Sequence, residues 1–189
     1  MMYAKNNNGV RITAEPGVVA TCPNCGNEVK AKCGDIKIWH FAHISLQDCD
    51  TWSEGETEWH REWKEMFPES EREIVIKPHR ADIVHKGTVI EFQSKSLDLY
   101  SLYDREKFYG KMVWVTKSDE TKFSFKLKEK NGRMYFSFRW KWCSETWKNA
   151  TKQIYVDIGD DFMFKIWKIY DNNYGAGEML TKQEFLGEF

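Results

Sequence analysis

The alternation of apolar and polar residues predicts a β-hairpin near the middle of the chain. Two short apolar runs, residues 81–84 and 89–92, flank the pair Lys86-Gly87. Glycine accepts the positive φ that a two-residue hairpin turn needs, so this pair predicts the turn. The two runs are then expected to be neighbouring antiparallel strands.

This register brings two acids together. Asp82 falls opposite Glu91, and Gln93 points the same way as Glu91 because side chains alternate along a strand. Two like charges directly opposite each other in a sheet are unfavourable. They persist most readily with a divalent cation between them, so the hairpin predicts a metal site at Asp82 and Glu91.

The segments beside the hairpin predict a mixed α/β fold. In chain order, the predicted elements are a helix over 54–67, a strand over 73–77, the two hairpin strands, a helix over 97–109 and a strand over 112–116. The second helix connects two strands, which implies at least one parallel pair.

The two ends of the chain are predicted to be richer in strands. Residues 1–20 predict a short strand or hairpin. Beyond residue 121 the predicted elements are a hairpin turn at Asn131-Gly132, a strand pair over 153–158 and 161–170, and a short final helix over 181–189.

Composition narrows the class of protein. The chain has 189 residues, of which 41% are hydrophobic and 30% charged, as expected of a folded domain with a small appendage. Its net charge of -1 means that nucleic-acid binding would need a local basic surface. No apolar run approaches the roughly 18–20 residues of a membrane span, and the N-terminus has no apolar signal core. We therefore expect a cytoplasmic protein that has no membrane partner.

A cysteine and histidine cluster predicts a structural zinc site. The chain has five cysteines, and Cys22-Pro-Asn-Cys25-Gly forms a CxxC knuckle whose two thiolates can bind one ion. The preferred remaining ligands are His43 and Cys49, which would complete a tetrahedral site. The competing set replaces Cys49 with His40. Ordinary cysteines and a core histidine are the structural alternative.

A stripe on the predicted helix over 54–67 adds candidate chemistry. Glu56, His60 and Lys64 are spaced four apart and would share one helix face. Facing the hairpin, they would add a carboxylate, an imidazole and an ammonium to its acids. Each also has an ordinary interpretation. Glu56 suits a capping box with Ser53, His60 a boundary histidine, and Lys64 a solvated side chain.

Several motifs together resemble a known family. They are CPNCG, WHFAH, ETEWHREWK, RAD and EFQ, followed by Arg105, Glu106, Tyr109 and the segment MVWV. Over residues 20–116 this combination resembles the CoiA-like competence proteins of the PD-(D/E)XK nuclease superfamily. The resemblance implies an α/β fold with an αβββαβ restriction-endonuclease-like core, an N-terminal zinc-binding module and a β-rich C-terminal extension. The expected boundaries are 1–52, 53–120 and 121–189.

The resemblance also implies roles for the hairpin residues. In that superfamily the hairpin Asp and Glu bind Mg²⁺ or Mn²⁺, so Asp82 and Glu91 are the implied ligands, joined by the carbonyl of Phe92. Glu56 matches an acidic position on the first helix. His60 is expected to contact phosphate or assist proton transfer.

Gln93 departs from the superfamily, which usually has lysine there. Glutamine still donates a hydrogen bond to a phosphate or a water, but it brings no charge. Lys64 is the preferred source of that charge, and Lys95 is the alternative. CoiA-like proteins resemble this chain at Gln93, so E-x-Q is interpreted as a family variant.

These residues predict a metal-dependent deoxyribonuclease that acts in DNA recombination or processing, with DNA and recombination proteins as partners. The alternatives are a catalytically inactive DNA-binding module with the same fold, and a zinc-stabilised adaptor.

Basic and tryptophan residues interleave in the C-terminal third. They could form a stacking surface, although tryptophans on strands usually belong to the core. The residues are Arg139, Trp140, Lys141, Trp142, Trp147 and Lys148.

Overall fold

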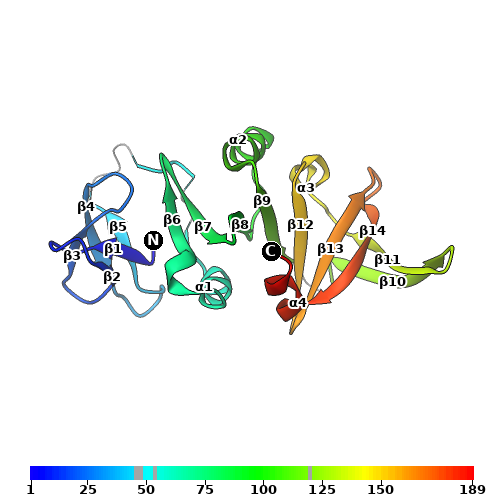
Figure 1. The fold of residues 1–189 in the computed structure, drawn as a ribbon, viewed down its shortest axis with the longest axis horizontal. Helices are drawn as coiled ribbons and strands as arrows, with labels where there is room; N and C mark the ends of the chain where they lie inside the picture. The colour runs from blue at the N-terminus through cyan, green and yellow to red at the C-terminus, as the bar shows by residue number, and fades with distance from the viewer. Residues whose placement is uncertain (45–48, 53–54, 119–120) are drawn as a thin grey trace. The chain divides into compact units, whose positions relative to one another are not determined.

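The computed structural model describes residues 1–44, 49–52, 55–118 and 121–189. The chain divides into two compact units, Met1–Val84 and His85–Phe189. Both are rich in β-strands and carry helices, which gives a mixed α/β protein (Figure 1). Among the residues described, no helix is long and apolar enough to cross a membrane.

The first unit begins with a small sheet. Its strand order is β2 (Arg11–Thr13), β1 (Tyr3–Lys5), β3 (Val19–Thr21), β4 (Glu28–Lys32) and β5 (His40–His43). Strand β4 alternates strictly between exposed and buried positions, so one face of the sheet is apolar. Val29 and Phe41 pack on that face with small residues, including Cys22. This miniature core places the first cysteine of the knuckle inside the unit.

Helix α1 (Glu58–Glu65) begins later than predicted. Thr57 caps it, because its side chain accepts a hydrogen bond from the His60 backbone N–H, while His60 Nδ1 accepts one from the Thr57 N–H. Glu56 therefore precedes the helix, and the predicted helical stripe that included it is wrong. The alternative cap, Ser53, lies outside the described residues.

Two longer strands complete the first unit. After the short 3₁₀ turn η1 (Glu69–Glu71), strand β6 (Arg72–Ile76) pairs antiparallel with β7 (His79–His85). Ala81 and Ile83 of β7 are fully buried, as the apolar run predicted. Asp82, between them, points to the opposite face of the strand.

The second unit is built on one sheet with helices beside it. Its strand order is β10 (Phe123–Lys130), β11 (Arg133–Trp140), β14 (Tyr174–Thr181), β13 (Phe162–Ile169), β12 (Gln153–Gly159), β9 (Met112–Lys117) and β8 (Thr88–Gln93). Its helices are α2 (Leu99–Tyr109), α3 (Glu145–Asn149) and α4 (Lys182–Gly187). Strands β8 and β9 are parallel, which confirms the predicted crossover.

The order α1, β6, β7, β8, α2, β9 along the chain is the predicted order of elements. The hairpin at Asn131-Gly132 is also confirmed, since both residues have positive φ and Lys130 pairs with Arg133. Strand β14 was not predicted. It contains Gly175 and Gly177, and glycine usually weakens a strand.

Those two glycines have a packing reason. A Cβ atom at Gly175 would clash with the carbonyl oxygen of Lys168 and the ring of Phe138, and one at Gly177 would clash with the carbonyl oxygen of Lys165 and the ring of Phe164. Both rings are buried, and they contact each other edge to face. The aromatic core of the second unit therefore needs a strand without side chains at these positions.

Candidate functional site

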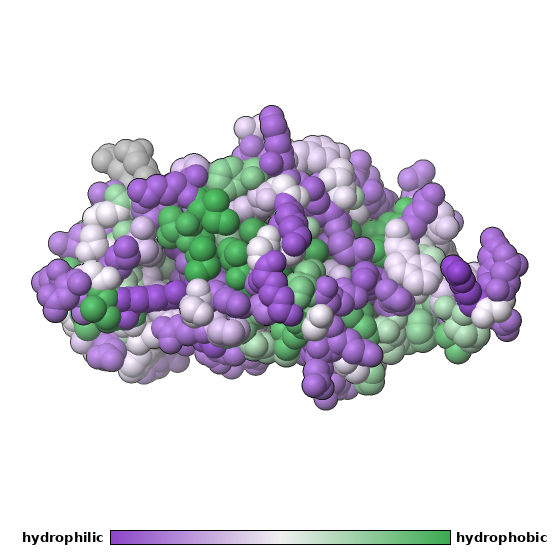
Figure 2. Space-filling view, in the orientation of Figure 1, coloured by the Kyte–Doolittle hydropathy of each residue, from purple (hydrophilic) through white to green (hydrophobic). Residues whose placement is uncertain are grey.

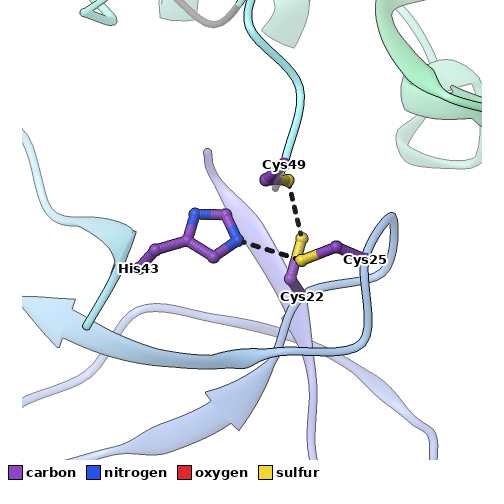
Figure 3. Close-up of side chains that lie close together, drawn as sticks. All are labelled: Cys22, Cys25, His43 and Cys49. Carbon is purple, nitrogen blue, oxygen red and sulfur yellow. Dashed lines mark hydrogen bonds between the residues drawn. The ribbon is translucent and has the colours of Figure 1, made fainter. Parts of the chain in front are cut away.

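The predicted zinc ligands come together in the first unit. Cys22 and Cys25 lie on the knuckle between β3 and β4, His43 ends β5, and Cys49 enters from a separate segment (Figure 3). One ligand atom from each residue lies within 4.8 Å of the others. His40 lies outside this group, and its Nδ1 is instead 2.8 Å from the carbonyl oxygen of Ile38.

The spacing of these atoms suits a tetrahedral metal site. Two sulfurs bound to one zinc at about 2.3 Å each are about 3.8 Å apart. The Cys22 and Cys49 sulfurs are 3.7 Å apart, and Cys25 Sγ is 3.3 Å from His43 Nε2. A disulfide needs sulfurs at about 2.05 Å. The donor set is therefore consistent with structural zinc, which would join three segments of the unit.

The knuckle backbone supports this geometry. The Gly26 N–H donates to the Cys22 carbonyl at 3.0 Å, and Gly26 has a φ of 78, a conformation that favours glycine. Burial would raise the pKa of Cys25, but the Asn27 N–H and the neighbouring thiols lower it below the ordinary value. Burial raises the pKa of Cys49 to about 11.

The segment that follows Cys49 is connected to strand β7. Asp50, which follows Cys49, accepts hydrogen bonds from the Arg80 N–H at 2.9 Å and from His79 Nδ1 at 2.8 Å. The ring of His79 also stacks on Trp52. Closing the metal site therefore fixes the beginning of the strand that carries Asp82.

A second cluster surrounds a buried lysine. Lys64 Nζ lies 2.9 Å from Asp82 Oδ1 and 3.2 Å from both Glu56 Oε1 and Glu73 Oε1. The Lys64 side chain is only 5% exposed, whereas that of Asp82 is 23% exposed. Burial would lower the pKa of Lys64, but the three carboxylates raise it well above its usual range. Lys64 is therefore held as a cation.

Glu73 is the member of this cluster that sequence reasoning missed. Its carboxylate accepts hydrogen bonds from the Met2 and Tyr3 N–H groups, and its Oε2 lies 3.8 Å from Arg80 Nε. Burial would raise the pKa of Glu73, but the charges of Lys64 and Arg80 hold it far below the usual range. An acidic residue at the start of a short strand gives no signal of such burial.

The other predicted site residues lie on β8 in the second unit. Glu91 is buried, and its Oε2 lies 3.7 Å from Arg105 Nη1 of α2. Phe92 and Gln93 are also buried, at 3% and 2% exposure. Alternation along the strand places Gln93 on the same side as Glu91.

The turn before β8 has the predicted backbone. Lys86 and Gly87 have φ values of 45 and 76, as a type I′ turn requires at both central positions. Asp82 belongs to the first unit and Glu91 to the second. Their opposition across the hairpin stays a prediction.

Two neighbouring residues of the RE-x-FY segment have different roles. Arg105 faces Glu91, whereas the Glu106 carboxylate accepts hydrogen bonds from Trp114 Nε1 at 2.9 Å and from the Thr151 N–H at 3.0 Å. Glu106 thus connects α2 to β9 and to the segment before β12. It serves the fold of the second unit.

The comparisons with known proteins concern the segment that holds the cysteine and histidine cluster. Residues 20–51 match the family described as Competence protein CoiA, N-terminal domain. No curated protein and no solved structure matches the chain. The segment that holds the cysteine and histidine cluster is therefore CoiA-like.

The zinc assignment predicts a loss of folding in one variant. Cys25→Ser should lower bound zinc from about one ion per chain to near zero and unfold the first unit, because structural zinc contributes folding free energy directly. Elemental analysis and limited proteolysis measure both effects. Cys33→Ser, a matched change outside the ligand group, should keep the metal. A folded Cys25→Ser protein with unchanged zinc would contradict the assignment.

The buried cluster predicts a pH-dependent stability difference. Glu73→Gln should lower the free energy of unfolding by about 1.5–3 kcal/mol at pH 7, because it removes the buried carboxylate that lies between Lys64 and Arg80 and weakens its charge-assisted hydrogen bonds. The pKa of Glu73 is lowered in the folded state, so its contribution is present above the unfolded pKa of about 4.3 and is lost as pH falls further. The gap between wild type and variant should therefore shrink below that pH.

Urea unfolding followed at several pH values measures this gap. The matched control is Glu69→Gln, because Glu69 is an exposed acid of the same unit. Its effect should stay within about 0.5 kcal/mol at every pH. Equal effects of the two substitutions at pH 7 would show that the cluster contributes no stability.

Proposed function

We propose that the chain is a metal-dependent deoxyribonuclease that acts in DNA recombination or processing. The observation that carries the proposal is the contact between Lys64 and Asp82 at 2.9 Å, inside a cluster of three carboxylates. Asp82 is the most accessible carboxylate of that cluster. An accessible acid held by a buried cation is suited to bind a metal ion on its exposed side.

The proposed ligands of Mg²⁺ or Mn²⁺ are Asp82, Glu91 and the carbonyl of Phe92. Such an ion lowers the pKa of a bound water and neutralises charge on the phosphate. The hairpin turn at Lys86-Gly87 supports this pairing, because its φ values suit the register that sets Asp82 opposite Glu91.

Three further side chains have proposed roles. Gln93 donates a hydrogen bond to a phosphate oxygen or to the attacking water. Lys64 supplies the positive charge that Gln93 lacks, and it holds the carboxylate of Asp82 in place. His60 caps the helix, because its Nδ1 accepts a hydrogen bond from the Thr57 N–H. Its proposed role in the reaction is to contact phosphate or assist proton transfer.

A second candidate function is a DNA-binding module without catalysis. The observation that favours it is the position of Arg105, whose Nη1 lies 3.7 Å from Glu91 Oε2. This guanidinium, like the ammonium of Lys64 beside Asp82, offsets carboxylate charge that the nuclease needs for its metal. Gln93 in place of the usual lysine points the same way.

Nuclease assays with matched variants separate the two candidates. Purified protein should cleave DNA with Mg²⁺ or Mn²⁺ and not with chelator, tested on single-stranded, duplex and branched substrates. Asp82→Asn and Glu91→Gln should each lower the rate by on the order of 10²-fold or more. The control Glu62→Gln, an exposed acid on α1, should cleave as the wild type does.

The remaining outcomes are also decisive. Cleavage by both variants at the wild-type rate would mean that the metal site is misassigned. DNA binding without cleavage by the wild type in either metal would favour the second candidate.

A further inference from the structure

The sheet of the second unit has two faces of different chemistry at its β10–β11 end. Along β10, apolar and acidic residues alternate with serine and lysine, and β11 continues the alternation in register. Lys126 pairs with Ser137, Lys128 with Tyr135 and Lys130 with Arg133, so these side chains share one face. We call it the basic aromatic face.

The opposite face is the aromatic core. Phe123, Phe138 and Phe164 are buried there, with ring centroids 5.0 to 5.4 Å apart. Helix α4 covers part of the basic aromatic face at β12, where Phe185 packs on Tyr155. Among the described residues, the side chains of this face on β10 are exposed, as are Arg139 of β11 and Tyr174 of β14.

Positive charge gathers on the exposed part of this face. The register of β11, β14 and β13 places Arg139, Ala176 and Lys168 on the same face as the lysines of β10. The acidic residue of β14 on this face, Glu178, lies 3.7 Å from Lys165, which Glu188 at the C-terminal end of α4 also contacts, at 2.7 Å. In the described strands, the basic side chains left on the face are Lys126, Lys128, Lys130, Arg133, Arg139 and Lys168. This surface is strongly basic in a chain whose net charge is -1.

Exposed rings lie among these charges. Tyr135 stacks on Trp167 with centroids 6.5 Å apart and an interplanar angle of 27°, yet Trp167 is 51% exposed. They line a shallow groove of about 580 Å³ that Lys130, Arg133 and Tyr170 also line. In the space-filling view, this end of the second unit has hydrophilic atoms beside paler and apolar ones (Figure 2).

The combination of basic and aromatic side chains indicates which kind of polyanion this face would bind. The basic side chains would bind the phosphate groups of any nucleic acid. The exposed rings distinguish a single strand from a duplex, because only unpaired bases can stack on aromatic side chains. An acidic protein would use the charges but has no need of a half-exposed tryptophan stacked on a tyrosine.

We propose that the basic aromatic face binds single-stranded nucleic acid, with bases stacked on Trp167 and Tyr135 and phosphates held by the lysines of β10. The face belongs to the second unit and uses none of the proposed catalytic residues. The inference therefore goes beyond the proposed nuclease activity, and binding in the presence of chelator tests it whether or not the protein cleaves DNA.

Fluorescence anisotropy with a labelled oligothymidine of about 16 nucleotides measures this binding in the full chain, in chelator. The single strand should bind at least about ten-fold tighter than a duplex of equal length. Trp167→Leu should weaken binding about ten-fold, and Trp167→Phe, which keeps a ring, should keep most of the affinity. Lys128→Glu should weaken binding. It should also reduce the slope of log affinity against log salt concentration by about one.

Matched controls separate these effects from general damage. Phe162→Leu changes a ring on the opposite face of the same strand that is 45% exposed, and it should leave binding unchanged. Lys111→Glu makes the same charge change at an exposed position outside the face. Circular dichroism checks that each variant is folded.

Three results would overturn the proposal. They are equal affinity for duplex and single strand, equal affinity for polyglutamate and the oligonucleotide, and Trp167→Leu binding no more weakly than Phe162→Leu.

Discussion

The first unit depends on one constraint: the buried, charged ammonium group of Lys64 must keep its carboxylate partners. A lone buried charge is expensive, so its three carboxylate partners must stay in place. They come from the segment before α1, from β6 and from β7, and Glu73 also receives two N–H groups of the N-terminal segment. One cation thus holds together parts of the chain that are distant in sequence.

The same cluster links the fold to the proposed chemistry. Lys64 holds the carboxylate of Asp82, and Asp50, beside the proposed zinc ligand Cys49, holds the start of the same strand. A metal ligand needs this kind of fixed orientation, because a loosely held carboxylate loses ordering entropy on binding. The CoiA-like segment therefore positions the strand that carries Asp82, although it does not contain that strand.

The sequence predicted correctly those features that depend only on residues adjacent in the chain. The Asn131-Gly132 turn and the CxxC knuckle follow from the backbone needs of a few adjacent residues. Glu73 could not be found this way, because the backbone N–H groups that it accepts from, those of Met2 and Tyr3, are about seventy residues away in sequence. Strand β14 was missed because glycine is unusual in strands. The reason for Gly177 is that a side chain there would clash with the neighbouring strand, at the Lys165 carbonyl and the Phe164 ring, which are distant in sequence. The start of α1 was misplaced because Thr57 and His60 form a cap that uses a histidine in place of glutamate.

The central claim is that Asp82 and Glu91 hold a hard divalent cation. Titration of the zinc-loaded protein with Mn²⁺, followed by electron paramagnetic resonance, tests it without relying on turnover. The account predicts a bound Mn²⁺ whose affinity falls about ten-fold or more in Asp82→Asn and in Glu91→Gln. Mn²⁺ binding of the same strength in wild type and both variants, or no Mn²⁺ binding at all, would contradict it.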